Sequence, residues 1–118
     1  MTVAEVLRIG KEWRAGELTF ASINPFTQAP WAAVPEATKV DVDDAIAAAR
    51  EAFDHGPWPR LGADERAAVL NRIADLIERD ADALALAESQ DNGKGIREVS
   101  GQIKALPAWY RYFGQLAT

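Results

Sequence analysis

The sequence contains no cysteine, only one histidine (His55) and no apolar run of the roughly 20 residues that a membrane-spanning helix needs. The lack of cysteine excludes disulfides, zinc–thiolate centres and a cysteine nucleophile within this chain. One histidine excludes metal sites built on two histidines and leaves one candidate base for a Ser-His-Asp arrangement. The first residues also lack the apolar core of a signal peptide, so we expect a cytoplasmic protein without a membrane partner.

Positive charge is in the minority, because 13 Lys and Arg stand against 18 Asp and Glu and give a net charge of −5. This balance provides no electrostatic surface for nucleic acid. Apolar residues, in contrast, make up 48% of the 118 residues and include 23 alanines. That content is sufficient for one small folded protein.

The composition changes near residue 40. Residues 1–40 carry no net charge and three of the six prolines, whereas residues 41–118 carry the whole net charge of −5 and most of the alanine. We therefore expect an N-terminal strand or hairpin arm at 1–40 and a helical segment at 41–118.

Short extended pieces are expected in the first segment. Val6–Trp13 and Leu18–Ile23 are predicted to form a hairpin across Arg14–Glu17, a connection that contains glycine. Asn24-Pro25 predicts a turn, because proline biases the preceding residue away from the helical conformation. Trp31–Val34 is a candidate third strand.

Helical periodicity begins at Asp41, which is predicted to be an N-cap. An apolar stripe follows at intervals of four, three and four residues, which indicates a helix that packs through one face and ends at His55-Gly56-Pro57. The members of this stripe are Val42, Ile46, Ala49 and Phe53.

A second helix is predicted over residues 63–79, where Asp75 and Arg79 can form an ion pair four residues apart. A third is predicted to start at one of the aspartates at 80 and 82. It should end at Asn92-Gly93, because these residue types accept the left-handed conformation of a helix C-cap.

A fourth helix is predicted over residues 96–117, and Pro107 should kink or restart it. Its last turns are apolar on nearly every side, which is typical of a helix that is buried all round. The chain as it stands is thus predicted to be α+β, with short antiparallel strands followed by about four helices. The apolar residues of the last turns are Trp109, Tyr110, Tyr112, Phe113, Leu116 and Ala117.

Three motifs have a chemical interpretation, but each has a better structural one. Asp41–Asp44 lacks the ligand and the glycine that a calcium loop needs at its next positions, so helix capping is favoured. Asn92–Gly95 lacks the first glycine and the final Ser or Thr of a phosphate-binding loop, so a helix C-cap and turn is favoured. His55 adjoins Asp54 without a nucleophile elbow, so a surface histidine at a helix end is favoured.

Read in order, a series of short motifs resembles the amino-terminal quarter of the NAD(P)-dependent aldehyde dehydrogenases. The resemblance covers residues 7–117, and it is the order and spacing that make it specific. The motifs are Ile9-Gly10-Lys11-Glu12-Trp13, Ile23-Asn24-Pro25-Phe26-Thr27, Ala33-Val34-Pro35-Glu36-Ala37-Thr38, Ala49-Arg50-Glu51-Ala52-Phe53, Trp58-Pro59, Glu65-Arg66-Ala67, Asp91-Asn92-Gly93-Lys94 and Arg111-Tyr112-Phe113-Gly114.

The resemblance implies part of an α/β enzyme with a Rossmann-type cofactor domain and a strand arm used in forming a homo-oligomer, a dimer or a tetramer. It implies oxidation of an aldehyde to a carboxylic acid through a cysteine nucleophile and hydride transfer to NAD or NADP. In the family these catalytic and cofactor-binding residues follow the segment represented here. We therefore assign no catalytic or cofactor-binding residue to this chain and expect it to be inactive and to bind no cofactor by itself.

Two further sites are implied by the resemblance. A monovalent cation, Na⁺ or K⁺, would be held by Asp91 and by the backbone carbonyls of Ser22 and Ile23, since hard cations prefer oxygen ligands. Leu106 and Trp109 would lie near the substrate tunnel. A surface aspartate and plain core packing are the structural alternatives.

Two hypotheses of different class remain at this stage. In the first, the chain is a piece of an aldehyde dehydrogenase that needs the rest of that chain as its partner. In the second, it is a complete small helical protein that serves as a binding or assembly module. The apolar last helix, which ends without a capping signal, favours the first.

Overall fold

The computed structural model describes residues 6–117, which form two compact units that divide after Pro59. Each unit is described by itself. The strands lie within residues 6–36 and the helices begin at Lys39, so the change in composition near residue 40 is the change from strands to helices. Residues 1–5 of the expected arm lie outside the described residues. The α+β class predicted for this chain is confirmed.

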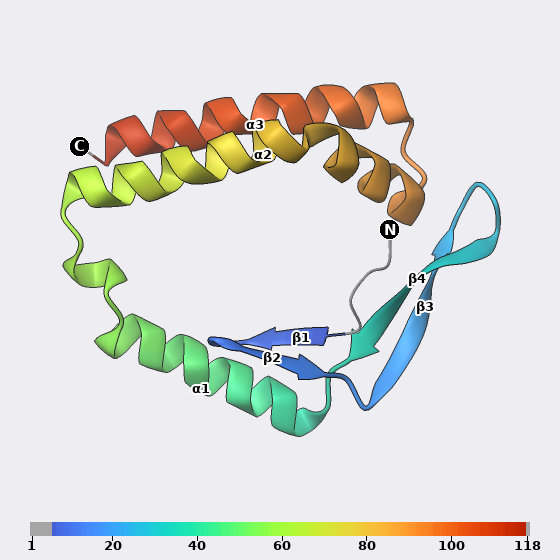
Figure 1. The fold of residues 1–118 in the computed structure, drawn as a ribbon, viewed down its shortest axis with the longest axis horizontal. Coiled ribbons are helices and arrows are strands. Elements are labelled where there is room, and N and C mark those ends of the chain that lie inside the picture. Colours follow the sequence, from blue (N-terminus) through green and yellow to red (C-terminus); the bar gives the residue numbers. More distant parts are fainter. Residues whose placement is uncertain (1–5, 118) are drawn as a thin grey trace. The chain divides into compact units, whose positions relative to one another are not determined.

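The first unit contains two separate antiparallel hairpins (Figure 1). β1 (Val6–Ile9) pairs with β2 (Glu12–Ala15), and β3 (Leu18–Asn24) pairs with β4 (Ala29–Glu36). The predicted pairing of residues 6–13 with 18–23 is wrong. The first segment instead folds on itself at Gly10, whose φ of +56° places it in the left-handed region that glycine adopts without strain.

The turn predicted at Asn24-Pro25 is confirmed and joins β3 to β4. The Asn24 side-chain oxygen accepts hydrogen bonds from the backbone N–H groups of Phe26 (2.9 Å) and Thr27 (3.3 Å). Gln28 adopts a φ of +58° and donates its backbone N–H to the Asn24 carbonyl at 2.8 Å. Asparagine is favoured at such positions because its short side chain mimics a backbone turn.

Helix α1 (Lys39–His55) begins three residues earlier than expected, because Thr38 and not Asp41 is its N-cap. The two side chains form a capping box. Asp41 donates its backbone N–H to the Thr38 hydroxyl at 3.2 Å, and Thr38 donates its backbone N–H to the Asp41 carboxylate at 2.9 Å. The predicted apolar stripe of Val42, Ile46, Ala49 and Phe53 is exposed, so among the described residues it contributes to no core.

The second unit is a pair of long helices, α2 (Ala63–Asn92) and α3 (Ile96–Leu116), which lie side by side and antiparallel (Figure 1). The predicted break at residue 80 does not occur. Ala81 and Ala85, just beyond the expected break, are buried against Val99 and Ile103 of α3, and this packing keeps the chain helical. The short turn 56–62 before α2 contains a 3₁₀ turn, Trp58–Arg60.

The end of α2 is as predicted. Gly93 has a φ of +79° and donates its backbone N–H to the Ser89 carbonyl at 3.0 Å, which caps the helix. Pro107, in contrast, does not restart the last helix, since α3 continues through it with the proline fully buried. None of the helices in the described part of the chain is long and apolar enough to span a membrane.

Candidate functional site

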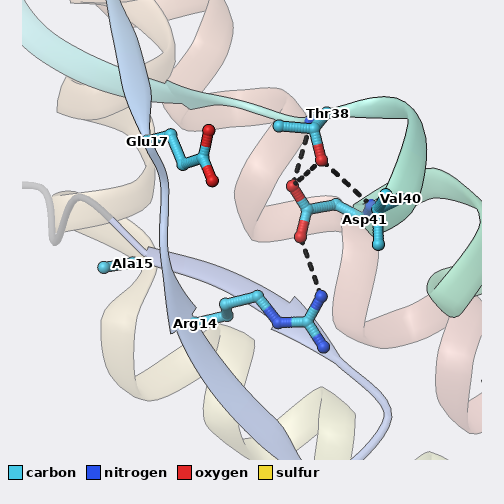
Figure 2. A pocket seen from close by; sticks show the side chains of 6 residues that line it. All are labelled: Arg14, Ala15, Glu17, Thr38, Val40 and Asp41. Carbon is cyan, nitrogen blue, oxygen red and sulfur yellow. Dashed lines mark hydrogen bonds and ion pairs between the residues drawn. The ribbon is translucent and has the colours of Figure 1, made fainter.

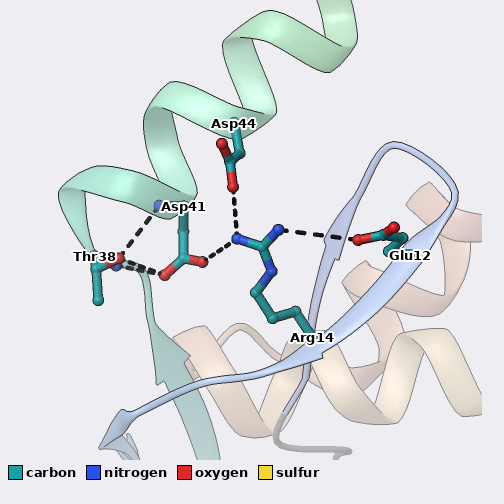
Figure 3. Close-up of polar contacts among 5 residues, drawn as sticks. All are labelled: Glu12, Arg14, Thr38, Asp41 and Asp44. Carbon is teal, nitrogen blue, oxygen red and sulfur yellow. Dashed lines mark hydrogen bonds and ion pairs between the residues drawn. The ribbon is translucent and has the colours of Figure 1, made fainter.

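The most highly connected polar group of the first unit is the guanidinium of Arg14 on β2 (Figure 3). One of its terminal nitrogens donates to the carboxylates of Asp41 (2.9 Å) and Asp44 (2.8 Å) at the start of α1. Its other terminal nitrogen lies 3.9 Å from the Glu12 carboxylate. Asp41 is the buried member of this group, at 8% exposed. Arg14 therefore fastens the first hairpin to the N-terminal turn of α1.

The protonation equilibria of this cluster are displaced in the direction that such pairing requires. The pKa of Asp41 is lowered, first by the hydrogen bonds from the Thr38 hydroxyl and backbone N–H and then by the Arg14 guanidinium. The pKa of Arg14 is raised, first by its hydrogen bond to Asp44 and then by that to Asp41. Both groups stay charged, so the cluster offers no group poised to transfer a proton near neutral pH.

A cavity of about 480 Å³ opens beside this cluster (Figure 2). Its charged atoms are already partnered by one another, and no nucleophile stands beside a base, so the arrangement is that of a structural junction. The lining residues are Arg14, Ala15, Glu17, Thr38, Val40 and Asp41.

His55 lies beside a second cavity, of about 530 Å³, between the first hairpin and the end of α1. Its Nδ1 is 2.9 Å from the Glu51 carboxylate, one turn earlier in the same helix. The neighbouring Asp54 is instead bonded by Arg50. The side chain of His55 is largely exposed, in agreement with a histidine at the end of a surface helix.

The turn after α2 is a tied helix end. The Lys94 ammonium lies 2.9 Å from the Glu88 carboxylate, and its backbone N–H donates to the Asn92 side chain at 2.9 Å. Lys94 also lowers the pKa of Glu88. Its charge is therefore used within the turn, as the C-cap interpretation requires.

The two predicted tunnel residues lie on α3 in the second unit, and both are exposed. Trp109 lines an apolar cavity of about 280 Å³ together with Leu70, Tyr110 and Phe113. Leu106 lies three residues earlier on the helix and does not line it. The structure thus places Trp109, but not Leu106, at an apolar recess.

The predicted cation ligands lie on different units. Ser22 and Ile23 are in β3, where the Ser22 hydroxyl accepts a hydrogen bond from the Trp31 indole at 3.0 Å. Asp91 is in the last turn of α2 and is exposed. Within residues 6–117 no three His, Cys, Asp or Glu side chains are grouped as metal ligands. The cation site stays a prediction.

Two arginines that organise the structure are absent from the sequence predictions. Besides Arg14, Arg111 of α3 bonds both Glu78 (2.7 and 3.2 Å) and Asp75 (2.9 Å) of α2, which raises the pKa of Arg111 and lowers that of Glu78. The predicted pair of Asp75 with Arg79 is accordingly wrong, and Arg79 bonds the adjacent Asp80. Paired acidic residues on one helix face were the available signal, but the partners are 27 to 36 residues away.

Residues 13–118 match the family model described as the aldehyde dehydrogenase family. The chain belongs to this family. It is 42% identical, over 94% of its own length, to (Z)-2-((N-methylformamido)methylene)-5-hydroxybutyrolactone dehydrogenase from Acinetobacter baylyi. Over 85% of its length it is 40% identical to the NADP/NAD-dependent aldehyde dehydrogenase PuuC of Escherichia coli.

Solved structures agree with these relatives. A point mutant of betaine aldehyde dehydrogenase from Staphylococcus aureus, in complex with NAD⁺, superposes with a TM-score of 0.90 at 34% identity over 96% of this chain. The chain covers 23% of that structure, 23% of the Acinetobacter relative and 22% of PuuC. It corresponds to an N-terminal portion of an aldehyde dehydrogenase, and the hypothesis of a complete small binding protein is not favoured.

Proposed function

We propose that this chain supplies the N-terminal quarter of an enzyme that oxidises an aldehyde to a carboxylic acid with NAD⁺ or NADP⁺. The observation that carries the proposal is the agreement in fold and sequence over 96% of the chain with a solved aldehyde dehydrogenase of which it covers only 23%. In such an enzyme a Rossmann-type domain in the remainder of the chain would bind the cofactor.

The described residues do not fit the cofactor itself. A dinucleotide site needs a strand, a tight glycine turn and a helix N-terminus that faces the pyrophosphate. The closely spaced glycines here, Gly93 and Gly95, follow a helix, and Lys94 between them is paired with Glu88. We therefore propose that the chain has a structural and positioning role and by itself neither binds dinucleotide nor turns over aldehyde.

A chimera tests this proposal. Residues 1–118 would replace the matching part of E. coli PuuC, and formation of reduced cofactor would be measured with several aldehydes and with NAD⁺ and NADP⁺. The chimera should be active, because its first quarter keeps the family fold, whereas the isolated chain should show no turnover. An inactive but folded chimera, or saturable dinucleotide binding by the isolated chain, would contradict the proposal.

Trp109 is proposed to border the path of the aldehyde, and Leu106 to lie near it. The support is the apolar recess that Trp109 lines with Phe113, since apolar lining is typical of small-molecule sites. In the chimera, Trp109→Ala should change the relative kcat/KM for short and bulky aldehydes. Equal ratios in the variant and the parent chimera would assign Trp109 to packing alone.

A monovalent cation held by Asp91 and by the carbonyls of Ser22 and Ile23 is proposed for the complete enzyme. The support is chemical, because a carboxylate near the free carbonyls of a helix end offers the oxygen ligands that such ions prefer. The chimera should be more stable in K⁺ or Na⁺ than in tetramethylammonium at equal ionic strength, and Asp91→Asn should remove the difference. An unchanged difference in that variant would refute the site.

The complete enzyme is further proposed to act in the cytoplasm as a homo-oligomer, a dimer or a tetramer. The mass of the native chimera, measured by light scattering, tests the oligomeric state, and a single-subunit mass would refute it.

A further inference from the structure

The last three turns of α3 carry an apolar stripe that no described residue covers. Trp109, Tyr112, Phe113 and Leu116 are spaced three, four and seven residues apart, so they fall within an arc of about 100° on the helix. They are 61%, 52%, 53% and 63% exposed. We refer to these four residues as the α3 stripe.

The α3 stripe is distinct from the face that packs on α2. That face consists of Val99, Ile103, Pro107 and Gly114, all buried. Tyr112 and Phe113 meet edge to face with ring centroids 5.4 Å apart, and Phe113 and Trp109 border the recess beside Leu70. The stripe is therefore an ordered surface with a recess at its edge, on a helix that is already held from another side.

Charge is absent from the stripe. Between residues 105 and 117 the sequence has one ionisable side chain that is charged at neutral pH, Arg111, and its guanidinium is bonded to Glu78 and Asp75 of α2. An amphipathic helix that presents apolar anchors at i, i+3, i+4 and i+7 is a common surface for docking on an apolar partner.

The area of the stripe decides between two occupants. An aromatic side chain can bury roughly 150–250 Å², and about half of each is exposed here, so the stripe offers on the order of 400 Å². A stable interface buries about 800 Å² per partner, so two copies joined only through their stripes would form a weak pair. The relatives, in contrast, have about three quarters of a chain beyond the part that matches.

Resting on the proposed function, we propose that the isolated 118-residue chain docks in trans, through the α3 stripe, on a separate polypeptide that carries the remaining three quarters of an aldehyde dehydrogenase. The partner is thus a protein with an exposed apolar surface left by removal of its own first quarter. The exposed apolar residues of α1 offer such a partner additional surface.

Co-expression tests the proposal without a need for either part to be stable alone. A tagged 118-residue chain would be expressed with PuuC polypeptide that lacks the matching segment, and the recovered complex would be identified by intact mass and assayed for cofactor reduction. We expect a one-to-one complex. The double variant Trp109→Ser/Phe113→Ser should lower its recovery at least tenfold.

The matched control is Leu86→Ser on α2. Leu86 is 53% exposed, as is Phe113, but lies outside the stripe, so this variant should be recovered like the parent chain. Circular dichroism of each isolated variant, compared with the parent, verifies that the helices are retained.

Each outcome has one meaning. Equal recovery of the stripe variant overturns the stripe as the docking surface. An active chimera together with no complex from separate chains overturns docking in trans and leaves the proposed function standing. An inactive chimera and no complex overturn both. A dimer of the 118-residue chain that excludes the partner also overturns the proposal.

Discussion

One residue change, glycine to alanine, should have opposite effects at two positions of the second unit. At Gly93 the backbone has a φ of +79°, which alanine adopts only with strain of about 1–2 kcal/mol. At Gly101, within α3, an added Cβ meets nothing within 4 Å. Alanine there should stabilise the helix by about 0.8–1 kcal/mol, because glycine in a helix interior has the larger conformational entropy to lose.

The two variants should therefore differ by roughly 2–3 kcal/mol in free energy of unfolding, although they share the same chemical change. With a denaturant slope of about 1–2 kcal/mol per molar urea, the two unfolding midpoints would be separated by roughly 1–2 M. The assay is urea unfolding of the 118-residue chain followed by the helical signal in circular dichroism. The parent midpoint should lie between the two.

Two results would refute this reasoning. If Gly93→Ala left the midpoint unchanged, the left-handed cap would not be a feature of the chain in solution. If Gly101→Ala were destabilising, that face of α3 would be covered, in contradiction to the open space around Gly101.

Further predictions concern the core and the charged junction. Val99→Ala, which removes two methyl groups from a fully buried side chain, should cost about 1.5–3 kcal/mol in the same urea assay, while Leu86→Ala on the surface should stay within about 0.5 kcal/mol. Because the pKa of Asp41 is lowered in the folded chain, its contribution to stability is present above its ordinary value of 3.8 and is lost as the pH falls through its folded pKa. Melting temperatures across acidic pH should accordingly fall less steeply for Asp41→Asn than for the parent, while Asp43→Asn should keep the parent slope, and parallel curves for Asp41→Asn would contradict this role.

The sequence predicted the elements that depend on local chemistry. Asn24-Pro25 and Gly93 have conformations that few other residues tolerate, so the turn and the helix end could be placed correctly. Thr38 was missed as the N-cap of α1 although Thr-Lys-Val-Asp has the spacing of a capping box, because Asp41 was itself a good cap candidate.

Elements that depend on distant contacts could not be predicted in the same way. The capping preference of Asp80 is worth about 1 kcal/mol, and burial of Ala81 and Ala85 against α3 outweighs it, so α2 continues. Likewise, the acidic residues at 41 and 44 gave no indication that their partner is Arg14, across the whole second hairpin. For the candidate sites, the sequence placed Trp109 on an apolar helix face, while the roles of Leu106, Ser22, Ile23 and Asp91 stay predictions.

The contact between Arg14 and Asp41 closes a loop around the whole second hairpin. Because β3 and β4 satisfy their hydrogen bonds within that loop, its tip at residues 25–28 is remote from the contact that closes it. Even a doubling of such a flexible tip would add only about 0.6 kcal/mol to the entropic cost of closure. The tip is accordingly a place where sequences can gain or lose residues, or accept an inserted tag, while the ion pair at the base keeps the helix in its place.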